Sequence, residues 1–354
     1  MIEMKIEEIV REEIRNLKAY QVKEFPVEIK LDANESSYCL PEEFLDELFS
    51  AIKKVSFNRY PDPNAVKLKE VICQDLGVDR DKLIIGNGSD ELIQSIIIAF
   101  GGERERVLFP VPTFAMYEIL SIALGQVPIK VPLDDKWDLD LDAMKRAIKE
   151  ENPRIIFLSF PNNPTGNCFS SDKVLEIISL SKGIVVLDEA YFDFGRKSFL
   201  DSLKDFKNLI VLRSLSKIGM AGLRIGMMIA DSRLVEQVAK VKLPYNVNII
   251  SQEIARFILT NKGIIDRQIG LIIKEREKLA GEMKGFDTIT PFPTNANFIL
   301  FKEKSDNRII WDALLKNGIL IKDLNHMEFL KNCLRVTIGT EQENRRFLEA
   351  LKQI

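Results

Sequence analysis

The stretch Gly183-Ile184-Val185-Val186-Leu187-Asp188-Glu189-Ala190-Tyr191 decides the fold, because a run of apolar residues ends abruptly in two acidic side chains. Apolar residues at nearly every position predict a strand that is covered on both faces. Strands of this kind form parallel sheets, and the carboxyl ends of such strands carry the ligand sites of open α/β folds. We therefore expect Asp188 to lie at the binding edge of a sheet.

Similar apolar runs recur before and after this stretch, and amphipathic segments separate them. The runs are Lys82–Ile85, Arg106–Phe109, Arg154–Leu158 and Asn208–Leu212. This alternation predicts an α/β fold in which a mostly parallel central sheet lies between helices.

The pattern changes after about residue 262. A long charged helical stretch, Ile264–Lys284, is followed by the strand candidates Asn297–Phe301, Ile319–Ile321 and Cys333–Ile338 and by a final helix. We predict a large domain over residues 51–262 and a smaller α+β domain over residues 263–354. Residues 1–50 are expected to contribute to the small domain and to an active-site lid, and residues 1–16 to begin as an amphipathic helix.

The composition excludes several classes of protein. With 50 basic and 53 acidic side chains among 354 residues, the formal charge of -3 gives no broad attraction to nucleic acid or to an anionic membrane. No stretch approaches the roughly 20 apolar residues of a membrane span. The four cysteines are scattered and do not cluster with the single histidine, His326, so we expect no metal site and a reduced, cytoplasmic location.

Lys217 is the candidate nucleophile, because it follows a predicted strand in Arg213-Ser214-Leu215-Ser216-Lys217. A carbonyl cofactor such as pyridoxal phosphate needs an amine, an acid near its ring nitrogen, a donor near its phenolic oxygen and an anion site. The carboxylate of Asp188 is expected to be buried and would then require a cation, which a protonated ring nitrogen would supply. Tyr191 and Asn163 also follow strands and are candidate partners of the phenolic oxygen.

The candidate anion site is Gly86-Asn87-Gly88-Ser89-Asp90-Glu91, which follows one strand and opens the apolar helix Leu92–Phe100. Amide groups at a helix start attract anions, and the glycines allow close approach. Taken alone, this segment is better explained as a helix cap that binds no ligand. Ser214, Ser216 and Arg224 would add hydroxyl donors and a positive charge.

Taken together, these segments resemble the fold-type I pyridoxal-phosphate-dependent transferases, and most closely the histidinol-phosphate aminotransferase family. The resemblance is spread along the chain, over Arg59–Pro63, Gly86–Glu91, Pro112–Phe114, Pro161–Gly166, Asp188–Tyr191, Ser214–Lys217, Ala221–Arg224, Pro244–Asn248 and Leu334–Gly339.

The resemblance implies a role for each side chain around the cofactor. Lys217 would form the Schiff base, or internal aldimine, and move the proton between Cα of the substrate and C4′ of the cofactor. Asp188 would pair with the ring nitrogen, and Asn163 and Tyr191 with the phenolate oxygen. Phe114 would stack on the ring, where the family commonly has tyrosine. The residues expected to surround the phosphate are Ser89, Asp90, Ser214, Ser216 and Arg224.

The resemblance also implies how substrate and partner bind. Arg335 would grip the anionic group of the substrate, Tyr20 would lie near its phosphate and imidazole end, and Asn34 would lie in the segment that closes the site. Tyr60 matches a tyrosine that reaches the cofactor phosphate of the partner subunit. A homodimer with active sites at the subunit interface is therefore expected.

The expected reaction is a ping-pong amino transfer that interconverts L-histidinol phosphate and 2-oxoglutarate with imidazole acetol phosphate and L-glutamate, in histidine biosynthesis. An aromatic amino-acid aminotransferase or a threonine-phosphate decarboxylase would use the same fold and cofactor residues, so the fold does not choose between them. A cofactor-sensing regulator would need a DNA-binding module, for which residues 1–30 are too few. The spacing from Lys217 to Arg224 is one residue shorter than in many members of the family.

Overall fold

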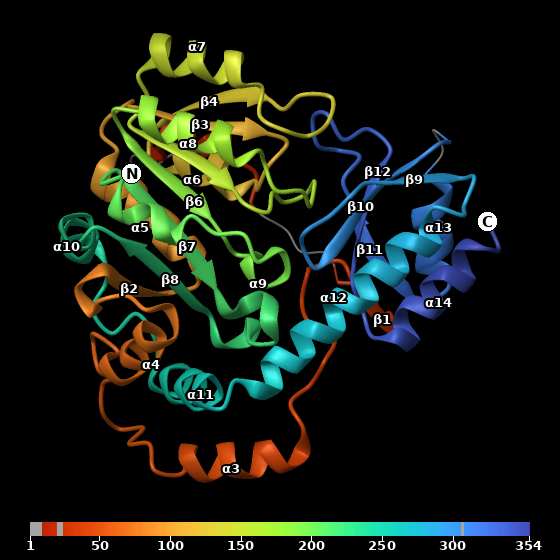
Figure 1. Ribbon diagram of the computed structural model, residues 1–354, viewed down its shortest axis with the longest axis horizontal. Helices are drawn as coiled ribbons and strands as arrows, with labels where there is room; N and C mark the ends of the chain where they lie inside the picture. Colours follow the sequence, from red (N-terminus) through yellow and green to blue (C-terminus); the bar gives the residue numbers. More distant parts are fainter. Residues whose placement is uncertain (1–8, 20–23, 306–307) are drawn as a thin grey trace, which may run out of the picture.

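The computed structural model describes residues 9–19, 24–305 and 308–354. Two β-sheets lie side by side, and the long helix α12 (Gly263–Met283) runs between them (Figure 1). Of the predicted N-terminal helix, residues 1–8 lie outside the described residues, and α2 (Glu12–Arg15) is helical. Tyr20 also lies outside the described residues.

The larger sheet has seven strands in the order β2-β8-β7-β6-β5-β3-β4. Their bounds are β2 Leu83–Asn87, β3 Arg106–Val111, β4 Val127–Pro132, β5 Ile155–Ser159, β6 Ile184–Asp188, β7 Leu209–Ser214 and β8 Ile225–Ala230. All neighbouring pairs from β7 to β4 are parallel, whereas β8 runs antiparallel to both β2 and β7. The predicted mostly parallel sheet is therefore confirmed.

The five apolar runs of the sequence all form strands of this sheet, but β4 and β8 were not predicted. β4 contains Pro128 and Pro132 and lies at the edge of the sheet, where the missing amide of proline costs no ladder hydrogen bond. β8 contains Gly226 and two methionines, which do not favour strands by propensity. Its position between two other strands outweighs this local preference.

Helices cover both faces of the larger sheet (Figure 1). One face packs against α5 (Ser89–Phe100), α6 (Met116–Ala123) and α10 (Ser232–Val241). The opposite face packs against α7 (Leu141–Glu151) and α8 (Ser171–Leu180). At the β2 and β8 end, this opposite face is covered by α4 (Val66–Leu76) and α11 (Ile249–Thr260), beside which lies α3 (Glu42–Ile52).

The smaller sheet has five strands in the order β1-β11-β12-β10-β9. Their bounds are β1 Ile29–Leu31, β9 Ile289–Pro291, β10 Phe298–Glu303, β11 Ile319–Asp323 and β12 Cys333–Thr337. The helices α13 (Ile309–Lys316) and α14 (Glu341–Leu351) complete this unit with α12. The predicted strands and long helix are present, and β1 adds the N-terminal segment to the sheet. The boundaries at residues 50 and 262 stay a prediction.

Side-chain caps explain where several helices begin. Asp140, Asp231, Asn248 and Thr340 each accept a hydrogen bond from an amide in the first turn of the helix that follows. These short polar side chains satisfy amide groups that have no partner inside the helix. Within the described ranges, no helix is long and apolar enough to cross a membrane.

Candidate active site

The candidate active site lies at the carboxyl edge of the larger sheet, where β6 and β7 end. Asp188 is the last residue of β6 and Ser214 is the last residue of β7. Because these strands pair in parallel, their carboxyl ends lie at the same edge. A 3₁₀ helix, η3 (Leu215–Ile218), follows β7 directly and carries Lys217. Strand pairing therefore brings together the two side chains on which the sequence prediction depends.

Asp188 is buried and accepts two hydrogen bonds. The hydroxyl of Tyr117 donates to its Oδ2 at 2.8 Å, and the amide of Ala190 donates to its Oδ1 at 3.1 Å. Burial raises the pKa of Asp188 to about 6, although both hydrogen bonds and, more weakly, the positive charge of Lys217 act in the opposite direction. A cation placed against this carboxylate would offset the cost of burying it.

Tyr117 is a site residue that sequence reasoning missed. Its ring is fully buried, stacks on Phe157 at a centroid distance of 4.8 Å and meets Phe114 edge to face at 5.6 Å. Burial beside Asp188 raises the pKa of the Tyr117 hydroxyl well above its usual value, so it stays protonated and donates. The available signal was its position three residues after Phe114, on the same side of a helix start.

Tyr191 and Asn34 meet beside Lys217. Tyr191 is the N-cap of the short helix α9 (Phe192–Gly195), and Lys217 Nζ lies 5.8 Å from the centre of its ring. The Nδ2 of Asn34 donates to the Tyr191 hydroxyl at 2.8 Å. Asn34 has a left-handed backbone, with φ of 57°, which asparagine adopts more readily than most residues. The predicted lid segment therefore contacts the predicted phenolate partner.

Two residues of the smaller unit, Thr337 and Asn297, hold the backbone of Asn34. Its amide donates to Thr337 Oγ1 at 3.0 Å, and its carbonyl accepts from Asn297 Nδ2 at 3.0 Å. Neither residue was predicted to lie at the site, because Thr337 ends β12 and Asn297 directly precedes β10, far along the chain from β6 and β7. These bonds fix the segment after β1 against β10 and β12.

Arg335 connects the smaller sheet to the larger unit. It lies on β12 and is buried, with its guanidinium 5.1 Å from the centre of the Phe298 ring. One terminal nitrogen donates to Asn163 Oδ1 at 2.5 Å and the other donates to the carbonyl of Asp32 at 2.7 Å. A planar, permanently charged group in this position is suited to binding a carboxylate or phosphate.

The residues of the predicted anion cradle lie together where α5 begins. Gly88, with φ of 83°, precedes Ser89, the first residue of the helix. Arg224 Nη2 lies 3.4 Å from Asp90 Oδ2, and its Nη1 donates to Ser216 Oγ at 3.5 Å. Ser214 donates to Ser216 Oγ at 3.0 Å. Helix amides, hydroxyls and a guanidinium therefore converge at one place.

Glycines permit this convergence at two positions. A Cβ on Gly88 would lie 2.5 Å from Arg224 Nη2. A Cβ on Gly226 in β8 would lie 2.5 Å from the backbone of Gly88 and Ser89. Because backbone atoms cannot rotate away, a side chain at residue 226 would displace the start of α5.

A buried ion pair lies directly behind the site, and sequence reasoning did not single it out. Arg213 Nη2 lies 3.1 Å from Glu189 Oε2, and Ser198 and the amide of Phe199 also donate to this carboxylate. The guanidinium of Arg213 stacks on Phe192 at 3.6 Å. Because Glu189 follows Asp188 and Arg213 precedes Ser214, the pair fastens the ends of β6 and β7 to each other.

Comparison with known proteins identifies the family. Residues 26–351 match the family described as "Aminotransferase class I and II". The chain belongs to this aminotransferase family. The predicted family and fold type are therefore confirmed.

Relatives of this aminotransferase span nearly the whole chain. It is 40% identical to the histidinol-phosphate aminotransferase of Aquifex aeolicus (strain VF5), over 98% of each chain. It is also 40% identical to that of Thermoanaerobacter pseudethanolicus, over 99% of each chain. The crystal structure of the histidinol-phosphate aminotransferase from Clostridium acetobutylicum is 27% identical, with a TM-score of 0.84 over 92% of this chain and 98% of that one. The enzyme from Sinorhizobium meliloti, in complex with pyridoxal-5′-phosphate, shares the fold, with a TM-score of 0.86, 22% identity and 98% coverage of each chain.

The site of the aminotransferase fits pyridoxal phosphate, the cofactor predicted from the sequence. Asp188 is a buried carboxylate that can take the protonated ring nitrogen, and Lys217 supplies the amine. The cradle at the start of α5 suits a phosphate, and Phe114 packs against Tyr117 beside Asp188. These features supply the contacts that a phosphorylated pyridine aldehyde needs.

The side chain of Tyr60 does not lie at the candidate active site of its own chain. Its side chain is 80% exposed and its ring stacks on that of Tyr245, at a centroid distance of 4.6 Å. The remaining predicted residue, Tyr20, lies outside the described residues.

Proposed function

We propose that this aminotransferase interconverts L-histidinol phosphate and 2-oxoglutarate with imidazole acetol phosphate and L-glutamate, a step of histidine biosynthesis. The observation that carries the proposal is the identity of about 40% to histidinol-phosphate aminotransferases over nearly the whole chain. Relatives of several bacterial groups share this name at 38% to 41% identity.

The proposed substrates share an anionic group, which explains how one site would accept both. Histidinol phosphate carries a phosphate and glutamate a carboxylate, and the buried guanidinium of Arg335 binds either through two parallel hydrogen bonds. Asn34 and, from the sequence, Tyr20 would contact the remainder of the substrate. The reaction would be ping-pong, because the amino group leaves one substrate before the other binds.

The side chains of the site divide the chemical work. When bound, pyridoxal phosphate supplies a carbonyl group and a ring that withdraws electrons. Lys217 would hold the cofactor through its amine; once the amino group of the substrate has displaced it, the freed amine would take the proton from Cα of the substrate and return it during the transfer. Asp188 would keep the ring nitrogen of the cofactor protonated, while Asn163 and Tyr191 would bind the phenolic oxygen of the cofactor.

The remaining cofactor contacts would hold the ring and phosphate in place. Phe114 would stack on the ring face. The phosphate would bind to the amide groups at the start of α5, including that of Asp90, and to Ser89, Ser214, Ser216 and Arg224. The contacts among Asp90, Arg224 and Ser216 support this assignment.

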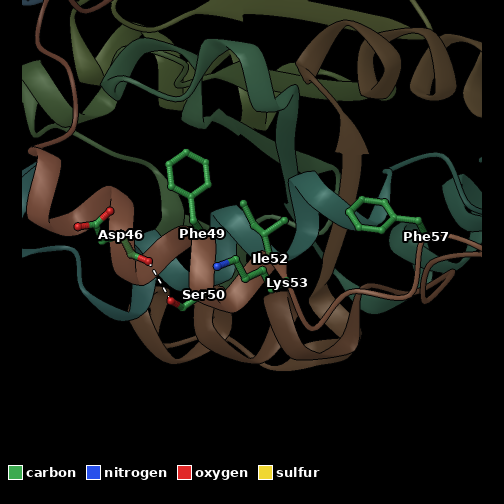
Figure 2. A pocket seen from close by; sticks show the side chains of 6 residues that line it. All are labelled: Asp46, Phe49, Ser50, Ile52, Lys53 and Phe57. Atoms are coloured by element: carbon green, nitrogen blue, oxygen red, sulfur yellow. Dashed lines mark hydrogen bonds between the residues drawn. The ribbon is translucent and has the colours of Figure 1, made fainter.

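The active protein is proposed to be a homodimer in which Tyr60 reaches the partner's cofactor phosphate. Apolar side chains exposed around α3 and nearby loops support an interface: Phe49 is 55%, Phe57 is 70% and Leu243 is 70% exposed. Figure 2 shows the hollow on α3 that Phe49 and Phe57 line together with Asp46, Ser50, Ile52 and Lys53. Sedimentation of the purified protein would give the assembly directly, and a monomer at micromolar concentration would contradict the proposal.

A cytoplasmic location is proposed with this function. The four cysteines, Cys39, Cys73, Cys168 and Cys333, are free. Burial raises the pKa of the Cys168 and Cys333 thiols to about 11, which keeps them protonated and unreactive.

The test of the proposed function is a single half-reaction. Protein loaded with pyridoxal phosphate is mixed with L-histidinol phosphate alone, and the visible absorption of the cofactor on Lys217 is followed. We expect rapid loss of this absorption at low substrate, much faster than with phenylalanine. Equal or faster reaction with phenylalanine would indicate an aromatic amino-acid aminotransferase, and release of carbon dioxide from threonine phosphate would indicate a decarboxylase.

A further inference from the structure

Tyr60 and Tyr245 form a stacked pair on the surface of the larger unit. Their ring centroids are 4.6 Å apart with an interplanar angle of 19°, while the side chains are 80% and 42% exposed. Neither residue belongs to a buried core cluster. Core packing therefore does not explain why these rings lie parallel.

The backbone of Tyr245 is held in a disfavoured conformation. Its φ is 58°, in the left-handed region that large side chains rarely adopt. Such a conformation persists only where the surrounding structure imposes it, and it concentrates at functional positions. Holding Tyr245 in this conformation therefore costs conformational free energy, which other contacts of the 242–248 loop must offset.

Hydrogen bonds fasten the 242–248 loop to the anion cradle of the same subunit. Asn246 Nδ2 donates to Glu91 Oε2 at 2.6 Å, and the amide of Asn87 donates to the same oxygen at 2.5 Å. Lys242 donates to Asn246 Oδ1 at 3.0 Å, which fixes the orientation of the asparagine amide.

The same loop is also fastened to the segment of residues 59–65, which carries Tyr60. Lys242 Nζ donates to the carbonyl of Pro63 at 3.3 Å. Gln252, in the first turn of α11, donates to the carbonyls of Asp62 and Val247, both at 3.0 Å. The backbone around Tyr60 is therefore held at Asp62 and Pro63, and the Tyr245 ring supports its side chain.

We propose that Tyr245 is a positioning residue, which aims Tyr60 of its own subunit at the cofactor phosphate of the partner subunit. The inference rests on the proposed homodimer. It adds the residue that orients the Tyr60 side chain, which would extend into the partner subunit. Free rotation about the Cα–Cβ bond would otherwise let the exposed phenol point in several directions. Tyr245 lies in a loop that is bonded to the anion cradle of its own subunit. Stacking on its ring therefore selects one direction for the phenol of Tyr60.

The first experiment compares cofactor affinity among three variants in homodimers. Tyr245→Leu removes the stacking ring, Tyr245→Phe keeps it, and Tyr60→Phe removes only the hydroxyl that would reach the phosphate. We expect the dissociation constant of pyridoxal phosphate to rise about tenfold in Tyr245→Leu and in Tyr60→Phe, and to be unchanged in Tyr245→Phe. Phe329→Leu is the matched control, because Phe329 is also exposed and has φ of 71°, in the smaller unit.

The second experiment uses hybrid dimers in which only one subunit keeps Lys217. Visible absorption of the lysine-bound cofactor then reports a single site. If one subunit carries Lys217→Ala with Tyr245→Leu and the other is unchanged, the remaining site receives Tyr60 from the altered subunit, so affinity falls about tenfold. If Lys217→Ala and Tyr245→Leu are placed in different subunits, the remaining site receives Tyr60 beside an intact Tyr245, so affinity is restored.

The outcomes separate failure of the inference from failure of the proposed dimer. Weak binding only when Tyr245→Leu lies in the same subunit as the reporting lysine would overturn the positioning role, because the effect would then be local. Unchanged affinity in Tyr245→Leu, with weakened affinity in Tyr60→Phe, would overturn it too, and would leave the dimer standing. A monomeric protein with full cofactor affinity would contradict the dimer itself. Dissociation of the Tyr245→Leu dimer would overturn the inference in favour of a purely structural role.

Discussion

Removing the buried hydroxyl of Tyr117 tests how strongly its hydrogen bond lowers the pKa of Asp188. In Tyr117→Phe, Asp188 loses the donor at 2.8 Å, whereas the ring keeps its stack on Phe157. A hydrogen bond to a charged group contributes about 1.5–3 kcal/mol, and one pKa unit corresponds to about 1.4 kcal/mol. The pKa of Asp188 in the cofactor-free protein is therefore expected to rise from about 6 by about one to two units.

The assay is the affinity for pyridoxal phosphate as a function of pH. Since the protonated ring nitrogen binds best to charged Asp188, affinity should weaken below the pKa of that carboxyl. In Tyr117→Phe this weakening is expected to begin about one to two pH units higher than in the unchanged protein. Ser121→Ala is the control, because the Ser121 hydroxyl donates to the Tyr117 carbonyl from the same helix but does not reach Asp188. An unshifted pH profile in Tyr117→Phe would refute the reasoning.

Three further predictions concern stability, substrate binding and the cradle. The pKa of Asp188 is raised from a usual 3.8 to about 6, so between these pH values the folded cofactor-free protein holds a proton that the unfolded chain has lost. Its free energy of unfolding should therefore fall by on the order of 3 kcal/mol between about pH 4 and pH 7. Denaturant titrations of Asp188→Asn should lack this slope. Arg335→Gln should lower kcat/KM by about 30-fold or more in both half-reactions, since it removes the buried charge that is proposed to pair with the substrate, whereas Lys302→Gln on the neighbouring strand should not. Gly226→Ala should weaken cofactor binding and lower the thermal midpoint by several degrees, while Gly222→Ala, where a Cβ meets nothing within 4 Å, should leave both unchanged in calorimetry and cofactor titration.

Sequence patterns predicted the larger sheet and the position of Asp188 at the carboxyl end of its strand, because both depend on the local sequence. A fully apolar run of about five residues indicates a covered strand, and the first polar residue after it must lie at the sheet edge. Lys217 and the Gly88 turn were predicted for the same reason. β4 was missed because its two prolines oppose strand formation locally, and only its edge position makes them acceptable.

Contacts between separate elements were not available from the sequence. The bond from Tyr117 to Asp188 depends on how α6 packs against the sheet, and a buried tyrosine without a polar role has the same local pattern. The contact of Arg335 with Asn163 depends on how the two sheets face each other. The roles of single residues followed from the family resemblance, because propensity and periodicity do not encode which side chains meet across 172 positions of chain.

The antiparallel direction of β8 has a consequence for the motion of the lysine loop. Because β7 ends and β8 begins at the same edge, the chain between Ser214 and Ile225 is tied at both ends to neighbouring central strands. The two ends of this segment cannot move without the strands, so the amide hydrogens next to Ser214 and Ile225 should exchange with solvent nearly as slowly as those of β7. Lys217 lies three residues after Ser214 and is therefore held close to the larger sheet, whereas Asn34 reaches the site from a segment that is bonded to the smaller unit.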